Sequence, residues 1–200
     1  MSLLSLIREK QETLEDAGPA APLPQRPEML LIGCVDARKD PMADLGIPRG
    51  RALILRNVAA LVHPEAEGRL TESAALAFAV REVKVKHLVV MGHTACGGIR
   101  AAINGSPSYS LRDYLDPISV MRDRVCAHVE GVEAQAAVLE REAVKYSVRA
   151  LRTYDYITAA EGNGDLMLHG WVIDIATGII HVWDERKDQF VPMSQTEPRG

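Results

Sequence analysis

Three residues of this chain carry side chains that commonly bind metal ions in proteins: Cys34, His93 and Cys96. Thiolate and imidazole groups are the ligands that zinc prefers, in tetrahedral geometry. Catalytic zinc sites use three protein ligands and leave a fourth position for water or substrate, and this set provides three. Two glycines follow Cys96 directly and let the backbone approach a metal. The set therefore predicts a catalytic zinc site.

Other interpretations of these residues stay open at this stage. Cysteine is among the most buried residue types, so Cys34 taken alone is as readily a core residue. The glycine-rich segment 92–98 could instead be a turn that binds an anion. Its spacing matches neither the dinucleotide-binding fingerprint nor the phosphate-binding loop, so we favour the metal site. The odd and low number of cysteines, 3, does not indicate a disulfide framework.

Apolar segments before these residues predict the strands that position them. Residues 29–32, 52–55 and 87–91 are mostly apolar runs, which are typical of strands buried on both faces. The segments between and after them predict helices over 71–83, 97–103, 111–128 and 132–153. Alternating strands and helices are typical of an α/β fold with a central, mostly parallel sheet and flanking helices.

A later hairpin completes the predicted sheet. Residues 166–175 and 179–183 read as two strands joined by a turn, which adds a late antiparallel edge strand. Ligand sites in open α/β sheets lie beyond the carboxyl ends of the parallel strands. Cys34 follows the first strand and His93 follows the third. If those strands are neighbours, the candidate ligands meet at one edge of the sheet.

The length of 200 residues favours a single domain with an extension. Residues 1–17 have the pattern of an amphipathic helix, and the proline-rich residues 18–24 end it, because proline lacks an N–H donor. We therefore expect an N-terminal helical arm and linker at 1–24, and one α/β zinc-enzyme domain at 25–200.

Composition excludes several classes of partner. Hydrophobic residues make up 47% and charged residues 25%, with a formal net charge of −4, so no basic surface for nucleic acid is indicated. No apolar stretch approaches the ~18 residues of a membrane helix. The apolar residues 1–7 are followed at once by charged ones, which does not fit a secretory signal. We expect a cytoplasmic protein.

Four segments together resemble the β-class carbonic anhydrase family. Residues 34–38 and 92–98 are similar to the paired signature of that family. Residues 56–62 resemble its Arg-Asn-x-Ala-x-x-Val segment, and residues 169–175 resemble its late strand. The four segments occur in the family's order over roughly residues 25–183. The α/β fold that the resemblance implies agrees with the sheet predicted above.

The resemblance also implies roles for individual residues. Cys34, His93 and Cys96 match the zinc ligands. Asp36 and Arg38 match a catalytic dyad, in which the aspartate orients a zinc-bound hydroxide and the arginine pairs with the aspartate. The substrate pocket would be lined by Gln25, Leu53, Val58, Phe78 and Gly97. Leu53 and Phe78 stand where the family often has an aromatic residue and a tyrosine, so the pocket is expected to be apolar.

The implied activity is the zinc-dependent, reversible hydration of carbon dioxide to bicarbonate and a proton, by attack of zinc-bound hydroxide. The implied assembly is a homodimer or homotetramer, with the arm wrapped over a neighbouring subunit. Two alternatives stay open: hydrolysis of carbonyl sulfide or carbon disulfide at the same zinc site, and a non-catalytic, zinc-stabilised paralogue. The Asp36–Arg38 dyad argues against the last, because a structural site does not need it.

Some relatives have a second, regulatory bicarbonate site. It uses a tryptophan three residues before the first zinc cysteine, together with an arginine and a tyrosine. Arg56 matches the arginine, but Leu31 stands at the tryptophan position and lacks an N–H donor. We therefore expect no such regulatory pocket, and water as the fourth zinc ligand near neutral pH.

Overall fold

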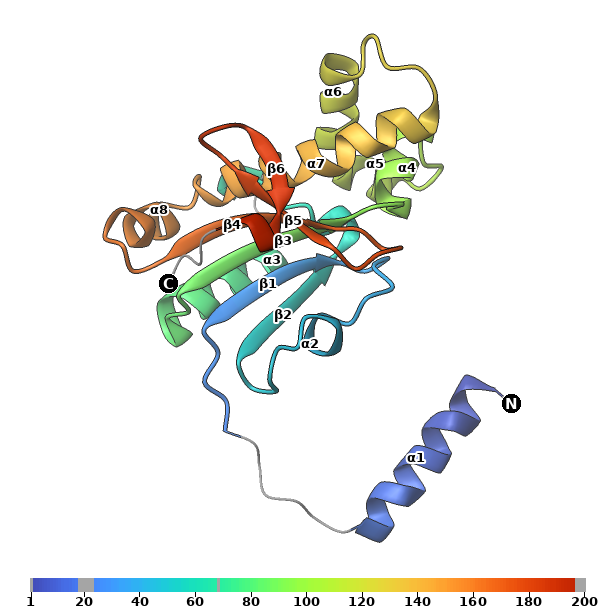
Figure 1. Ribbon diagram of the computed structural model, residues 1–200, viewed down its shortest axis with the longest axis vertical. Coiled ribbons are helices and arrows are strands. Elements are labelled where there is room, and N and C mark those ends of the chain that lie inside the picture. Colours follow the sequence, from blue (N-terminus) through green and yellow to red (C-terminus); the bar gives the residue numbers. More distant parts are fainter. Residues whose placement is uncertain (1, 18–23, 68, 197–200) are drawn as a thin grey trace.

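A six-stranded sheet forms the centre of the protein, whose computed structural model describes residues 2–17, 24–67 and 69–196. The strands lie in the order β2-β1-β3-β4-β5-β6 (Figure 1). They are β1 (Met29–Cys34), β2 (Ala52–Asn57), β3 (His87–His93), β4 (Met167–Ile173), β5 (Ile180–Asp184) and β6 (Gln189–Pro192). Strands β1 to β4 run parallel, whereas β5 and β6 are antiparallel to their neighbours. The predicted α/β fold with a mostly parallel sheet is confirmed.

The antiparallel end of the sheet differs in one detail from the prediction. Strand β5 is the expected hairpin partner of β4, but it does not form the edge, because β6 pairs along its outer side. The four residues of β6 are too few to show a hydrophobic period within the polar tail, so the sequence pattern did not indicate this strand.

Side chains alternate between two cores of unequal size, as the pleat of a strand requires. Leu30 and Ile32 of β1 point into the larger core, which the helices cover. Leu31, between them, points into a smaller cluster on the other face with Val89 and Met91 of β3. Both faces of β1 and β3 are thus buried, as their apolar runs predict.

The helices connect and cover the sheet. They are α1 (Leu3–Ala17), α2 (Pro41–Asp44), α3 (Leu70–Ala77), α4 (Gly97–Asn104), α5 (Tyr109–Tyr114), α6 (Asp116–Val125), α7 (Val132–Leu151) and α8 (Asp155–Gly162). A π-helical turn, η3 (Phe78–Val83), continues α3, and a 3-10 turn, η1 (Val58–Ala60), follows β2. Helix α7 packs across β3 and β4.

Two helical segments differ from the sequence prediction. The single helix expected at 111–128 is divided into α5 and α6, because Pro117 suits the first turn of a new helix and not a helix interior. The helix α8 was not predicted. It follows α7 after a short turn, and its eight residues give little periodic signal.

Helix α1 lies apart from the sheet in Figure 1. Its apolar side chains, Leu3, Leu4, Leu6, Ile7 and Leu14, are all exposed. The predicted linker lies outside the described residues except for Pro24, so the division into a 1–24 arm and a 25–200 domain stays a prediction. Within the described ranges, no helix combines the length and apolar character that a membrane span needs.

Candidate metal centre

The three predicted ligands converge at the carboxyl ends of two neighbouring strands. Cys34 ends β1 and His93 ends β3, and the two strands pair in parallel. Cys96 lies just before the first turn of α4. The ligand atoms of the three residues lie within 4.8 Å of one another, and the residues are 0%, 1% and 2% exposed. The predicted cluster is therefore present and buried.

The spacing of the cluster fits a tetrahedral metal ion. The Sγ atoms of Cys34 and Cys96 are 3.8 Å apart. Two sulfurs bonded to one tetrahedral zinc ion at about 2.3 Å each would lie roughly 3.8 Å apart. His93 Nδ1 contacts the carbonyl oxygen of Thr94 at 2.9 Å, whereas its Nε2 is buried and has no hydrogen-bond partner among the described residues. A buried polar atom without a partner is costly, and a metal ion would remove that cost.

The electrostatics of the site favour a thiolate. The hydrogen bond with Cys96 lowers the pKa of Cys34, and His93 lowers it further, against the opposing effect of burial. The same interaction and burial raise the pKa of Cys96. The amides of Asp36 and Ala59 donate hydrogen bonds to Cys34 Sγ at 3.3 and 3.2 Å. Such donors stabilise negative charge on the sulfur, which is the form that binds a metal.

Asp36 reaches the edge of the cluster. Its Oδ2 accepts a hydrogen bond from the Gly97 amide at 2.7 Å and lies 4.0 Å from His93 Nε2. A Cβ at position 97 would lie 3.1 Å from the same Oδ2, so the absence of a side chain permits this contact. Val58 is close by, because its Cγ1 packs against the backbone of Gly98, which follows Gly97. Asp36, Val58 and Gly97 are thus brought together with the three predicted ligands.

Arg38 does not pair with Asp36 in this structure, so the predicted dyad stays a prediction. The side chain of Arg38 is exposed, and no ion pair of the described residues joins it to Asp36. An exposed arginine gains little from such a pair, whereas the Gly97 amide, at the start of α4, competes for the carboxylate. Arg56 instead stabilises this loop by donating to the carbonyl oxygens of Ala37, at 3.2 Å, and Lys39.

Two of the other three predicted pocket residues, Gln25 and Leu53, lie at the opposite end of the sheet. Leu53 pairs with Leu30 near the amino ends of β1 and β2, and Gln25 lies next to Gly50 in the turn before β2. Phe78 begins η3 and is 54% exposed. At about 3.3 Å per residue, β1 separates its two ends by roughly 17 Å. Within one chain, Gln25 and Leu53 do not reach the cluster.

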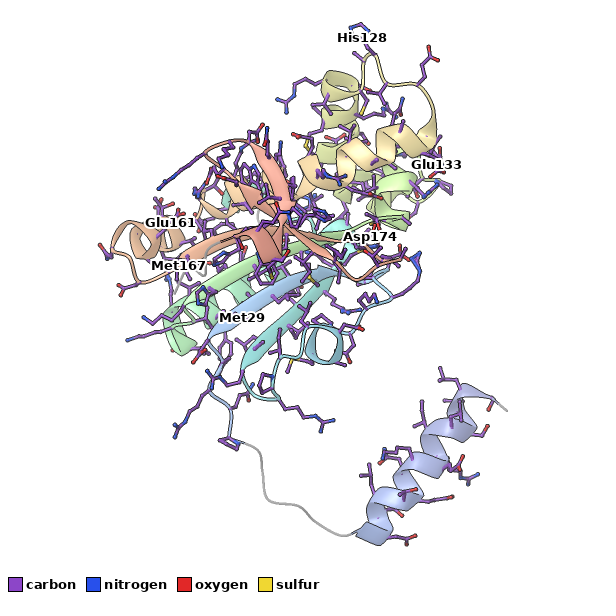
Figure 2. All side chains as sticks on the ribbon, viewed as in Figure 1. Met29, His128, Glu133, Glu161, Met167 and Asp174 are labelled. Carbon is purple, nitrogen blue, oxygen red and sulfur yellow. The ribbon has the colours of Figure 1, made fainter. Side chains whose placement is uncertain are left out.

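Figure 2 makes the two ends of the sheet visible. Met29, which begins β1, and Met167, which begins β4, are labelled at one end, and Asp174, which follows β4, is labelled at the other. The cluster lies at the end that Asp174 marks, because parallel strands share their carboxyl edge.

Sequence reasoning missed two supporting residues. Glu140 on α7 is 6% exposed and accepts a hydrogen bond from the Cys96 amide at 3.1 Å. Burial raises the pKa of Glu140, against the opposing effect of that amide. An acidic residue among apolar positions of a helix was the available signal. Ala59 donates to Cys34 from a left-handed backbone, φ 62°, and nothing in an alanine indicates that conformation.

Comparisons with known proteins agree with this site. The family model described as carbonic anhydrase matches residues 29–180. The chain is 31% identical to beta carbonic anhydrase 6, mitochondrial, of Arabidopsis thaliana, over 85% of this chain and 61% of that protein. It is 30% identical to beta carbonic anhydrase 5, chloroplastic, of the same plant, over 80% of this chain and 55% of that protein. The chain thus spans less than two thirds of the length of either relative.

Solved structures give the same result for the fold. The β-carbonic anhydrase CcaA superimposes with a TM-score of 0.81 at 26% identity, covering 98% of this chain and 86% of that one. One chain from the structures of two tetrameric β-carbonic anhydrases of the filamentous ascomycete Sordaria macrospora matches with a TM-score of 0.72 at 28% identity, covering 90% of both chains.

The relatives overturn one prediction. Those from Arabidopsis are named as mitochondrial and chloroplastic proteins, which contradicts the expected cytoplasmic location. That expectation rested on the lack of a secretory-signal pattern and of a membrane-length apolar stretch, and neither feature separates the cytoplasm from an organelle.

The family model covers most of the sheet and all three residues of the cluster, and the relatives and structural neighbours are β-class enzymes by name. The chain therefore belongs to the β-class carbonic anhydrase family.

Proposed function

We propose that this protein catalyses the reversible hydration of carbon dioxide, with zinc held by Cys34, His93 and Cys96. The observation that carries the proposal is the buried triad: two sulfurs 3.8 Å apart beside an imidazole Nε2 that has no partner among the described residues. Two thiolates and one imidazole are a donor set suited to zinc, and they leave one coordination position open.

A zinc ion bound there would lower the pKa of water enough to provide a nucleophile near neutral pH. The net reaction consumes carbon dioxide and water and yields bicarbonate and a proton. The residues around the triad exclude bulk water and hold the two thiolates in place. The amides of Asp36 and Ala59 support the charge on Cys34, and Glu140 holds the peptide of Cys96.

Asp36 is the proposed orienting residue. Its Oδ2 is held by the Gly97 amide, and no hydrogen bond of the described residues engages its Oδ1. A carboxylate oxygen in this position can accept a hydrogen bond from the reacting water and aim a lone pair at the carbon of the substrate. Arg38, exposed and two residues away, is proposed to pair with Asp36 when the carboxylate turns from Gly97.

A second copy of the chain is proposed to complete the pocket. Val58 and Gly97 lie at the cluster, whereas Gln25 and Leu53 lie at the opposite end of the same sheet. The exposed Phe78 and the exposed apolar side chains of α1 support an assembly in which a neighbour covers them. The tetrameric state of the enzymes from Sordaria macrospora supports a homo-oligomer.

The function is tested by stopped-flow measurement of the acidification that carbon dioxide causes in weakly buffered solution. The zinc-loaded protein is expected to accelerate acidification well above buffer, and a His93→Ala variant is expected to lose that activity with most of its zinc. Carbonyl sulfide and carbon disulfide are assayed in parallel. Turnover of either gas without turnover of carbon dioxide would contradict the proposed substrate, and absence of all three activities would contradict a catalytic role.

A further inference from the structure

Glu140 is an acidic residue on the buried face of α7. The helix packs Ala136, Leu139, Ala143 and Val144 into the larger core, and Glu140 lies among them with 6% of its surface exposed. No ion pair of the described residues includes it. A buried carboxyl group needs a compensating contact, so its hydrogen-bond partner shows what the residue does.

That partner is the backbone of a candidate metal ligand. Glu140 Oε1 accepts a hydrogen bond from the Cys96 amide at 3.1 Å. Cys96 is preceded by Ala95, whose φ of 57° is left-handed, a conformation that costs energy for a residue with a side chain. The peptide between them therefore needs an external contact to hold its orientation. Glu140, which is 44 residues further along the chain than Cys96, supplies that contact.

The close packing of α7 on the sheet brings the Glu140 carboxylate within hydrogen-bond distance of the Cys96 amide. The helix lies directly on Gly92 of β3, where a Cβ would come within 2.7 Å of Val144 Cγ2 and 3.4 Å of the Glu140 carbonyl oxygen. Gly92 directly precedes His93 in β3. The close packing of α7 on Gly92 therefore lies beside His93, and the same helix carries the Glu140 contact with Cys96. Because close packing keeps this distance fixed, Glu140 cannot withdraw without disturbing β3.

We propose that Glu140 is a positioning residue, which fixes the orientation of the Cys96 peptide and so keeps the Cys96 sulfur in place to share a metal ion with Cys34 and His93. This inference rests on the proposed metal centre. It requires an oxygen acceptor at this position and does not require the negative charge. Hydrogen-bond partners around metal ligands typically affect metal affinity or activity by about 10–100-fold.

Two substitutions separate the contact from the charge. Glu140→Gln keeps an oxygen acceptor at the same reach and removes the charge. Glu140→Asp keeps the charge and withdraws the oxygen by one methylene group. Glu142→Asp is the matched control, since Glu142 is on the same helix and pairs with Lys145, away from the cluster.

Each protein is loaded with Co²⁺, and the sulfur-to-cobalt absorption and the rate of metal loss to a chelator are measured. We expect E140D to lose cobalt about 10-fold or more faster than wild type, with an altered absorption band. We expect E140Q and E142D to match wild type in both measurements. Wild-type behaviour of E140D, or equal defects in E140D and E140Q, would overturn the positioning role. A wild-type protein that binds no metal would instead contradict the metal centre itself, and the inference with it.

Discussion

Asp36 and Gly97 are joined by a 2.7 Å hydrogen bond from the Gly97 amide to Asp36 Oδ2. The contact connects the loop after β1 with the first residue of α4, and it places the carboxylate 4.0 Å from His93 Nε2. An acidic side chain thus lies beside the candidate metal centre and is held by an amide at a helix start, where negative charge is favoured.

The substitution Asp36→Asn is expected to retain zinc and lose most hydration activity. The amide oxygen of asparagine can still accept from Gly97, so the fold should be kept, but the remaining amide group donates where the carboxylate accepts. We expect a loss of about 100-fold or more in kcat, as for removal of a positioned acid–base group. Stopped-flow kinetics and metal analysis check this. Full activity of D36N at neutral pH would remove Asp36 from the mechanism.

Asp188 is expected to make stability depend on pH independently of the metal centre. Its Oδ1 lies 2.9 Å from Lys145 Nζ and accepts from Trp183 Nε1 at 3.0 Å. The contact with Lys145, and then that with Trp183, lowers the pKa of Asp188. Because the folded pKa lies below the unfolded one, the stabilisation is present above pH ~4 and is lost as pH falls through the folded value.

We therefore expect Asp188→Asn to lower Tm at neutral pH and to flatten the fall of Tm in acid. Asparagine tolerates the left-handed backbone of this position, φ 50°, and can still accept from Trp183. The side chain is largely exposed, so the change in the free energy of unfolding should stay below about 1 kcal/mol. Thermal melts of wild type and D188N across acidic pH test this expectation. Parallel profiles of Tm against pH would contradict a stabilising Lys145–Asp188 pair.

Bicarbonate is not expected to inhibit the enzyme cooperatively. Leu31, at the position where some relatives have a tryptophan, is fully buried in the smaller core with Val89. The guanidinium group of Arg56 is used by the carbonyl oxygens of Ala37 and Lys39. Activity measured against pH at several bicarbonate concentrations should show no steep, bicarbonate-dependent loss below neutral pH. A cooperative loss that deepens with added bicarbonate would refute this expectation.

The positions of Gln25 and Leu53, at the opposite end of the sheet from the cluster, predict an obligatory assembly. Sedimentation at micromolar concentration should show a dimer or tetramer. The Phe78→Glu variant should sediment as smaller species and have lower activity, because the substitution would place a charge in the proposed apolar contact between subunits. Tyr109→Glu is the matched control, since Tyr109 is an exposed aromatic residue on α5. A compact wild-type monomer with full activity would contradict the assembly.

Local sequence patterns predicted the parts of the fold that depend on local hydrophobicity. The apolar runs of β1 and β3 indicated buried parallel strands, and the general rule for such sheets then placed Cys34 and His93 together. The spacing of His93 and Cys96 supplied the third ligand. These predictions needed no knowledge of packing between distant segments.

The features that were missed depend on such packing. The carboxylate of Asp36 turns to an amide of α4, and not to Arg38, only once the two loops are folded against each other. Glu140 reaches Cys96 because α7 lies close on β3. The separation of Gln25 from the cluster within one chain could not be predicted from the sequence resemblance either. A resemblance matches residues by their order and does not say which subunit supplies them.

Titration of the zinc-stripped protein with zinc, with carbon dioxide hydration measured at each point, tests the central claim most directly. We predict that activity rises in proportion to added zinc and stops rising at about one zinc per chain. A Cys34→Ser variant treated in the same way should bind zinc far more weakly and stay near the rate of buffer. Full activity of the stripped protein before any zinc is added, or equal titration curves for wild type and C34S, would contradict a zinc-dependent hydration at Cys34, His93 and Cys96.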